Sequence, residues 1–217
     1  MTSSPWDWPD LSFNSAGFCL SLSRGQDVQR VLAAYAVAPE HVQPRSYAET
    51  IALFHPGVNL LLRVGTLADV GFCFEQGSVL GILAPVQNAM GGAGGESLTI
   101  CNTPEQSRVN VIHTKDGRTP VMFDLGMKLE PAQSTAVLQQ MDERWRADGR
   151  SKAQAALEVA SSWVGAPFGW QDSFAGVLDT AILPATHQPP ARPEPPRSQP
   201  SRSGLGRSGG PLIPPPA

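Results

Sequence analysis

The sequence predicts an α+β fold: a single domain with a mostly antiparallel sheet of about six or seven strands and flanking helices, followed by a disordered, proline-rich C-terminal tail. Three observations lead to this prediction. Apolar residues alternate with small polar residues near the N-terminus, the middle of the chain repeats that alternation between turn residues, and helical periodicity returns afterwards. Beyond residue 183, proline and glycine replace most large apolar residues.

The stretch around which the rest of the chain is organised begins with a strand. From Phe18 to Ser23 apolar and small polar residues alternate, so one side of the strand is apolar and the other is polar. Gly25 interrupts this pattern, and Asp27 is a suitable N-cap for a helix over 28–35. The later segments are expected to pair with this strand or to pack on this helix.

Strands dominate the middle of the chain. Pro39 and Pro44 enclose an expected loop, after which Ser46 and Glu49 form a capping box for a short helix ending near Phe54. Short runs of aliphatic and aromatic residues then predict strands at 58–64, 70–75, 79–83, 98–101, 109–113 and 120–123. The last two strands flank an Asp-Gly pair that is typical of a hairpin turn.

The remaining segments are predicted to be helical or flexible. The glycine-rich run Gly91–Gly95 predicts a flexible break between two strands. Helices are expected over 131–145 and from the capping box of Ser151 and Gln154 to Val164. A last short helix is expected over 172–182.

Composition divides the chain into an N-terminal aromatic and proline-containing arm (1–9), a globular α+β domain (10–183) and a disordered tail rich in proline, glycine and arginine (184–217). Four arginines against one glutamate give the tail a net charge of +3, so the rest of the chain carries −6 of the total of −3. A mildly acidic body argues against a nucleic-acid partner.

The sequence also predicts the cellular location of the protein. The N-terminus has neither a basic start nor an apolar run, and no stretch approaches the roughly 20 apolar residues of a membrane span. We therefore expect a cytoplasmic protein without a membrane partner. The three cysteines, Cys19, Cys73 and Cys101, lie in strand-like apolar runs without Cys-x-x-Cys spacing, which predicts buried free thiols.

No catalytic, cofactor-binding or metal-binding set is predicted from motifs. The Gly91–Gly95 run lacks the spacing of a nucleotide-binding loop, and the four histidines have no metal-ligand spacing. Cys101 with His113 as a nucleophile pair, and Asp116 with Asp124 as an acid and base, are hypotheses that need spatial proximity. The sequence favours a non-enzymatic role.

Two segments are candidates for protein binding. Trp6 and Trp8 form either an exposed partner site or a cap on the core. The tail contains two Pro-x-x-Pro elements with nearby arginines, which polyproline-reading domains accept unless the tail is only a passive tether. The tail candidates are Pro190, Arg192, Pro193, Pro196 and Arg197.

Several segments also follow one another in a familiar order. They are Gly17 to Gly25 before the first helix, Gly71 to Glu75 with Gly77 and Gly81, the strand from Glu96 to Ile100, the turn at Asp116 and Gly117, Phe123 with Asp124, and an alanine-rich helix ending at Val164 and Gly165. In this order they resemble a mainly actinobacterial family, domain of unknown function 6461. The resemblance implies an α+β domain in an actinobacterial or actinophage setting, with no established activity and no catalytic residues. Phe72 stands where that family usually has tryptophan, and the glycine-rich run is unusual for it.

Two functions from different classes remain open at this point. The leading expectation is a cytoplasmic, non-enzymatic protein-binding or adaptor domain that uses a proline-rich tether and has an unidentified protein partner. The alternative is a small-molecule-binding or enzymatic domain whose site is assembled from distant residues near the glycine-rich loop.

Overall fold

The first predicted strand, β1 (Phe18–Arg24), is central to the sheet. It pairs antiparallel with β4 (Val70–Gln76) on one side and with β5 (Glu96–Thr103) on the other. Every residue of β1 except Arg24 is buried, so both faces of this strand are covered. The computed structural model describes residues 17–92, 94–116, 121–130, 134–167 and 169–189.

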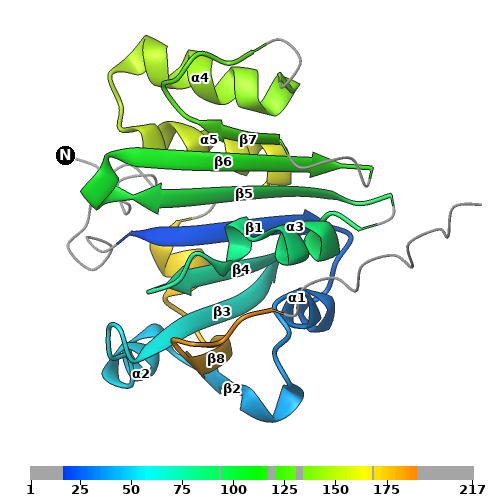
Figure 1. Ribbon diagram of the computed structural model, residues 1–217, viewed down its shortest axis with the longest axis vertical. Coiled ribbons are helices and arrows are strands. Elements are labelled where there is room, and N and C mark those ends of the chain that lie inside the picture. The colour runs from blue at the N-terminus through cyan, green and yellow to red at the C-terminus, as the bar shows by residue number, and fades with distance from the viewer. Residues whose placement is uncertain (1–16, 93, 117–120, 131–133, 168, 190–217) are drawn as a thin grey trace, which may run out of the picture.

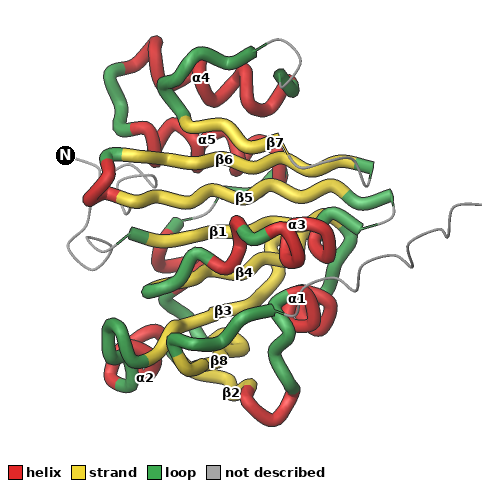
Figure 2. The backbone as a smooth tube through the Cα atoms, viewed as in Figure 1, coloured by secondary structure: helices red, strands yellow, loops and turns green. Residues whose placement is uncertain are grey.

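In the described part of the chain, eight strands form one antiparallel sheet in the order β2-β8-β3-β4-β1-β5-β6-β7 (Figures 1 and 2). The other strands are β2 (Val42–Arg45), β3 (Asn59–Leu67), β6 (Arg108–Lys115), β7 (Val121–Asp124) and β8 (Leu178–Pro184). The predicted α+β class is confirmed, and the sheet is slightly larger than expected.

The described helices are α1 (Val28–Ala34), α2 (Tyr47–Ala52), α3 (Ala84–Met90), α4 (Ala136–Asp148) and α5 (Lys152–Val164). Both predicted capping boxes are present, at the start of α2 and at the start of α5. Asp27 caps α1 by accepting a hydrogen bond from the backbone N–H of Arg30. None of the helices described is long and apolar enough to cross a membrane.

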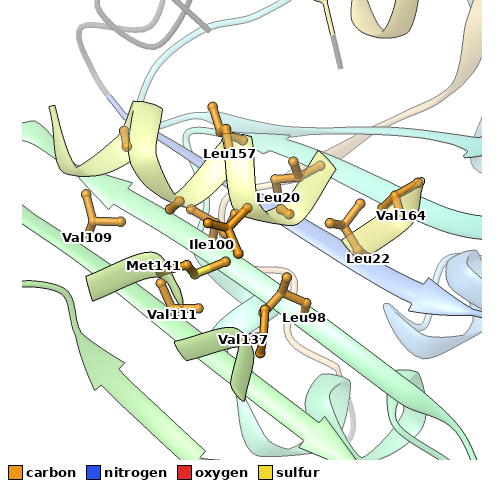
Figure 3. Close-up of a cluster of buried hydrophobic side chains, with 14 of the residues drawn as sticks. Leu20, Leu22, Leu98, Ile100, Val109, Val111, Val137, Met141, Leu157 and Val164 are labelled. Atoms are coloured by element: carbon orange, nitrogen blue, oxygen red, sulfur yellow. The ribbon is translucent and has the colours of Figure 1, made fainter. Parts of the chain in front are cut away.

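The two faces of the sheet are packed differently. One face, behind the sheet in Figure 1, is covered by α5 and α4 and forms an apolar core. Figure 3 shows that core, where the labelled side chains are Leu20, Leu22, Leu98, Ile100, Val109, Val111, Val137, Met141, Leu157 and Val164. The opposite face carries Cys19, Ser21 and Ser23 of β1, and α1 and α3 cover it. We call this second face the polar face.

The strand expected at 79–83 is wrong, because Leu80–Ile82 form a short 3-10 turn. β4 ends at Gln76, and Gly77, with a φ of 67°, turns the chain back over the polar face. The carboxyl group of Glu75 then accepts hydrogen bonds from two backbone N–H groups of the turn. Those N–H groups are therefore not available to pair with a strand.

The helix expected over 172–182 is also wrong. Trp170–Phe174 form a single π-helical turn, and Leu178–Pro184 form β8. β8 lies between β2 and β3 and pairs antiparallel with both. The segment containing Pro44, which was expected to be a loop, is the edge strand β2, where a proline without an N–H is tolerated.

The chain remains attached to the domain after β8. The backbone N–H of Ala185 donates to the carbonyl of Val58 at 3.0 Å, and His187 Nε2 donates to the carbonyl of Tyr35 at 2.9 Å. Pro189, the last residue described, is buried. The first six residues assigned to the tail on composition thus lie along the domain.

Candidate functional site

Two polar clusters lie at opposite ends of the central strands. The first surrounds Glu75, near the end where β1 begins, and the second surrounds Glu96, at the end where β1 finishes. These ends are on the left and on the right of the sheet in Figure 1. Glu96 directly follows the glycine-rich run Gly91–Gly95, so the second cluster lies where the sequence predicted a site assembled from distant residues.

Glu75 lies in the middle of a row of side chains across the polar face and is fully buried. Cys19 of β1 is directly opposite Glu75 of β4, and Cys101 of β5 is directly opposite Cys19. Side chains at directly opposed positions of an antiparallel pair share a face and approach closely. The register therefore brings one carboxyl group and two thiols together from three strands.

Hydrogen-bond donors surround both oxygens of the Glu75 side chain. Oε1 accepts from the hydroxyl of Tyr35 and from the N–H of Gly81, each at 2.8 Å. Oε2 accepts from the hydroxyl of Ser78 and from the N–H of Leu80, also at 2.8 Å. Burial raises the pKa of Glu75 above its ordinary value, and these hydrogen bonds oppose that effect. The carboxyl group thus fastens the turn after β4 and the residue after α1 to the sheet.

Further polar side chains extend this cluster across the polar face. The Tyr35 hydroxyl, which donates to Glu75, accepts from the Ser21 hydroxyl at 2.9 Å, and the Thr99 hydroxyl donates to Ser21 at 3.0 Å. Gln87 of α3 donates to Thr99 at 2.8 Å and accepts from Thr114 at 3.3 Å. Because buried polar groups are costly when unpaired, this network fixes α1 and α3 in one position over the sheet.

A cavity of about 200 Å³ opens beside the Glu75 cluster, and its walls include Phe18, Ser78 and Asn102. Ser78 belongs to both features, because its hydroxyl donates to Glu75 while the residue lines the cavity. Phe18 and Asn102 are the immediate sequence neighbours of the two opposed cysteines. Because side chains alternate along a strand, these two residues point away from the polar face, and the cavity adjoins the Glu75 cluster through Ser78.

All three cysteines are buried free thiols, as the sequence predicted. The thiols of Cys19 and Cys101 are hydrogen-bonded to each other. This hydrogen bond, together with burial, raises the pKa of Cys19, whereas the same hydrogen bond lowers the pKa of Cys101. Burial raises the pKa of Cys73, which lies opposite Ser21 of β1. Cys101 is thus the thiol whose environment favours ionisation.

Glu96 is shared by three basic side chains. His113 Nε2 lies 2.9 Å from Glu96 Oε1, Arg24 Nε lies 3.5 Å from Oε2, and Lys115 Nζ lies 4.0 Å from Oε1. Burial alone would raise the pKa of Glu96, but the hydrogen bond with His113 and the charge of Lys115 lower it below its ordinary value. Glu96 is therefore a carboxylate at neutral pH.

Trp163 near the end of α5 completes the second cluster. The guanidinium carbon of Arg24 lies 4.5 Å from the centroid of the Trp163 ring, and the Arg24 side chain also donates to the Trp163 carbonyl. The Trp163 side chain is hydrogen-bonded to Glu96. The Arg24 and Lys115 side chains are 43% and 58% exposed, so both cations still face solvent.

His113 is the most buried member of the Glu96 cluster, with 6% exposure. Its Nε2 is bonded to Glu96, while its Nδ1 is inaccessible to solvent and has no hydrogen-bond partner in the described part of the chain. With Nε2–H donating to the carboxylate, a neutral imidazole has a free acceptor lone pair at Nδ1. Such a nitrogen can accept a hydrogen bond.

The structure separates the residue pairs that the sequence left open. Cys101 lies on the polar face opposite Asn110, and His113, three residues further along β6, points to the other face, so Cys101 and His113 cannot act together. Asp124 is opposite Asn110 and lies 3.6 Å from Arg108, whereas Asp116 follows the far end of β6. Neither pair forms a site.

The sequence-predicted protein-binding residues lie outside the described residues. They are Trp6, Trp8, Pro190, Arg192, Pro193, Pro196 and Arg197. Sequence analysis did not select either glutamate as a site residue. One available indication was the charge of Glu75 in an otherwise apolar strand, and another was the position of Glu96 directly after a glycine run.

Within the described ranges, no three His, Cys, Asp or Glu side chains are grouped so that they could hold a metal ion. No family model, curated protein sequence or solved structure matches this chain. The resemblance to domain of unknown function 6461 accordingly stays a prediction.

Proposed function

We propose that the protein is a small-molecule-binding domain whose site is the Glu96 cluster, defined as Arg24, Glu96, His113, Lys115 and Trp163. The observation that carries this proposal is the hydrogen bonding of His113. Its buried imidazole is hydrogen-bonded to the Glu96 carboxylate at Nε2 and has no partner at Nδ1 among the described residues. A buried polar atom without a partner is costly in a folded protein. A ligand that supplies the missing hydrogen bond would remove that cost.

The cluster also indicates the chemistry of the ligand. The Nδ1 acceptor requires an O–H or N–H group, and the exposed guanidinium of Arg24 is suited to a carboxylate or phosphate. The ligand class is therefore a small hydroxylated or aminated molecule with one oxyanion. Because Nδ1 is inaccessible to solvent, the ligand must displace the side chains that cover it. The proposal concerns binding and assigns no reaction.

A screen of small hydroxy acids, amino acids and sugar phosphates by thermal shift should find members that raise the melting temperature. In protein with ¹⁵N-labelled histidine, the bound molecule should shift the Nδ1 resonance of His113 more than the resonances of the other three histidines. Arg24→Met should weaken binding about tenfold, since losing a charge-assisted hydrogen bond costs about 1.5 kcal/mol or more.

Arg108→Met is the matched control for this measurement. Arg108 is also a partly exposed strand arginine paired with a carboxylate, Asp124, but it lies at the other end of β6. Binding should be unchanged in this variant. A panel without any hit, or a hit that shifts another histidine and is insensitive to Arg24→Met, would contradict the proposal.

A second candidate is a cytoplasmic, non-enzymatic protein-binding or adaptor role through the proline-rich segment. The observation that favours it is the attachment of the chain by Ala185 and His187, with Pro189 buried. The contact of His187 with Tyr35, the residue that follows α1, lies three residues before Pro190, where the Pro-x-x-Pro elements begin in the sequence. A fixed starting point would present the elements at a defined position on the domain.

Purified SH3 and WW domains provide a direct test of this candidate by fluorescence titration. At least one domain should bind the full chain, and the double variant Arg192→Ala/Arg197→Ala should bind more weakly, because these arginines flank the proline elements. Deleting residues 190–217 should abolish binding and leave the melting temperature unchanged. If binding survives the deletion, it does not depend on the tail, and Trp6 and Trp8 become the next residues to substitute.

A further inference from the structure

Cys19 and Cys101 face each other across β1 and β5 on the polar face. We propose that these two residues are a modification site at which a peroxide, or a disulfide of the glutathione type, converts the two thiols to a reversible intramolecular disulfide. The site belongs to the Glu75 cluster and is independent of the ligand site proposed at the Glu96 cluster.

The geometry of the sheet already meets the requirements of the bond. Directly opposed residues in antiparallel strands have Cα atoms about 4.5–5.5 Å apart, within the range of about 4.4–6.8 Å found for disulfides. The two thiols are hydrogen-bonded to each other, so they already interact before any reaction. Forming the bond therefore needs no rearrangement of β1 or β5.

The environment assigns different roles to the two thiols. Because the Cys19 hydrogen bond lowers the pKa of Cys101, Cys101 is the thiol that loses its proton more readily, and its sulfur attacks the peroxide. Its sulfur displaces hydroxide and becomes a sulfenic acid. The Cys19 sulfur then attacks the sulfenic sulfur, the S–S bond forms, and water leaves with the Cys19 proton. Overall, two thiols lose two electrons and two protons, and hydrogen peroxide is reduced to two molecules of water. With a disulfide as the oxidant, the Cys101 sulfur attacks one of its sulfurs and displaces the first thiol, Cys19 then attacks the mixed disulfide and displaces the second, and the oxidant is reduced to two thiols.

Both cysteines are buried, with exposures of 0% for Cys19 and 1% for Cys101, so an oxidant reaches the pair only when the turn over the polar face opens. Gly81 packs against the Cys19 thiol. A Cβ atom at this position would lie 2.9 Å from Cys19 Sγ and 2.5 Å from Glu75 Oε1. Oxidation would remove the S–H of Cys19, which also donates to Glu75. The turn over the polar face would thus respond to the oxidation state of the pair.

Cys73 is an internal control for this proposal. It is buried on the same face, but its cross-strand partners are Ser21 of β1 and Val64 of β3. No cysteine is opposite it, so it should stay reduced. If burial or proximity to Glu75 alone determined oxidation, Cys73 would be oxidised to the same extent as Cys19 and Cys101.

The test is to treat the native full-length chain with hydrogen peroxide or with oxidised glutathione, to alkylate it after denaturation and to map its peptides by mass spectrometry. The number of alkylated cysteines should fall from three to one. A linked peptide pair containing Cys19 and Cys101 should appear, and dithiothreitol should remove it. The variant Cys73→Ala should behave like the wild type, and Cys101→Ala should give no intramolecular disulfide.

The wild-type peptide map decides the question even if a variant fails to fold. A link that includes Cys73, a disulfide between two chains, or three cysteines still open to alkylation after oxidation would overturn the proposal. Sulfinic acid at Cys101 without any linked peptide would also overturn it, because a resolving thiol in contact should intercept the sulfenic acid first.

Discussion

Replacing Arg63 with methionine should lower the free energy of unfolding by about 3–5 kcal/mol. Arg63 of β3 is fully buried, and its guanidinium donates to the Thr50 hydroxyl at 2.7 Å, to the Phe174 carbonyl at 2.9 Å and to the Gly176 carbonyl at 2.6 Å. Burial lowers its pKa to about 10, so the group remains charged at neutral pH. Methionine fills similar volume but has no donor, so it would leave these acceptors buried and unpaired.

Urea denaturation at neutral pH measures this effect, and Arg45→Met is the matched control. Arg45 of the edge strand β2 is only partly buried, and its guanidinium contacts Gln43 in the same strand. Removing the same charge there should cost less than about 1 kcal/mol, the usual range for a surface contact. If both variants lose the same free energy of unfolding, Arg63 stabilises the fold through its charge and not through the hydrogen bonds it donates.

Glu75→Gln should be the second most damaging substitution, lowering the free energy of unfolding by about 2–3 kcal/mol at neutral pH. Glutamine keeps the shape of the side chain, but its NH₂ group must face a donor, either the N–H of Gly81 or the N–H of Leu80. Glu143→Gln on α4, an exposed position, is the control and should change stability little. A loss below about 0.5 kcal/mol in Glu75→Gln, the range of surface substitutions, would refute the role of Glu75 as the acceptor that holds the turn.

The free energies of unfolding of the wild type and of Glu75→Gln should also depend differently on pH. The folded-state pKa of Glu75 is raised above that of the unfolded chain, which is about 4.3 for a glutamate. Between those two pKa values the folded state binds more protons, so stability falls as pH rises through that window. Glutamine does not titrate. The stability gap between wild type and Glu75→Gln should therefore widen as pH is lowered from 7 to 5, and a constant or narrowing gap would contradict the raised pKa.

Local patterns were enough to predict the centre of the fold. The alternation from Phe18 to Ser23 correctly predicts a strand with two unlike faces, because side chains in a strand alternate whatever its partners are. The capping boxes at Ser46 and Ser151 correctly predict where α2 and α5 begin, because the hydrogen bonds of a cap lie within four residues. These features depend only on neighbouring residues.

Features that depend on distant residues could not be read in the same way. The turn at Leu80–Ile82 has an apolar pattern typical of a strand, and its conformation is set by the Glu75 carboxyl group beneath it. Helix α3 was not identified, because its N-cap residue Leu83 makes no side-chain capping hydrogen bond, whereas α1 and α2 begin at the capping residues Asp27 and Ser46. Its Gln87 side chain packs on Thr99 because both belong to a network that only the folded sheet brings together.

The candidate sites show the same limit. Before the structure, Arg24, Glu75 and Asp124 could not be separated into functional and structural residues. The register of β1, β4 and β5 gives Glu75 its thiol and hydroxyl neighbours, and the end of α5 brings Trp163 to Arg24. The hypothesis of a site near the glycine run stays a prediction, and it did not include His113, whose hydrogen bond depends on its pairing with Glu96.

The position of β8 between β2 and β3 has a consequence for synthesis. β2 pairs with β8 alone, and β8 is more than a hundred residues later in the chain than β3. While the chain is still on the ribosome, β3 therefore keeps one edge unpaired until almost all of the described sequence has emerged, and β2 has no strand to join. A nascent chain with that unpaired edge is prone to aggregate, so the yield of folded protein should depend on how quickly β8 is synthesised.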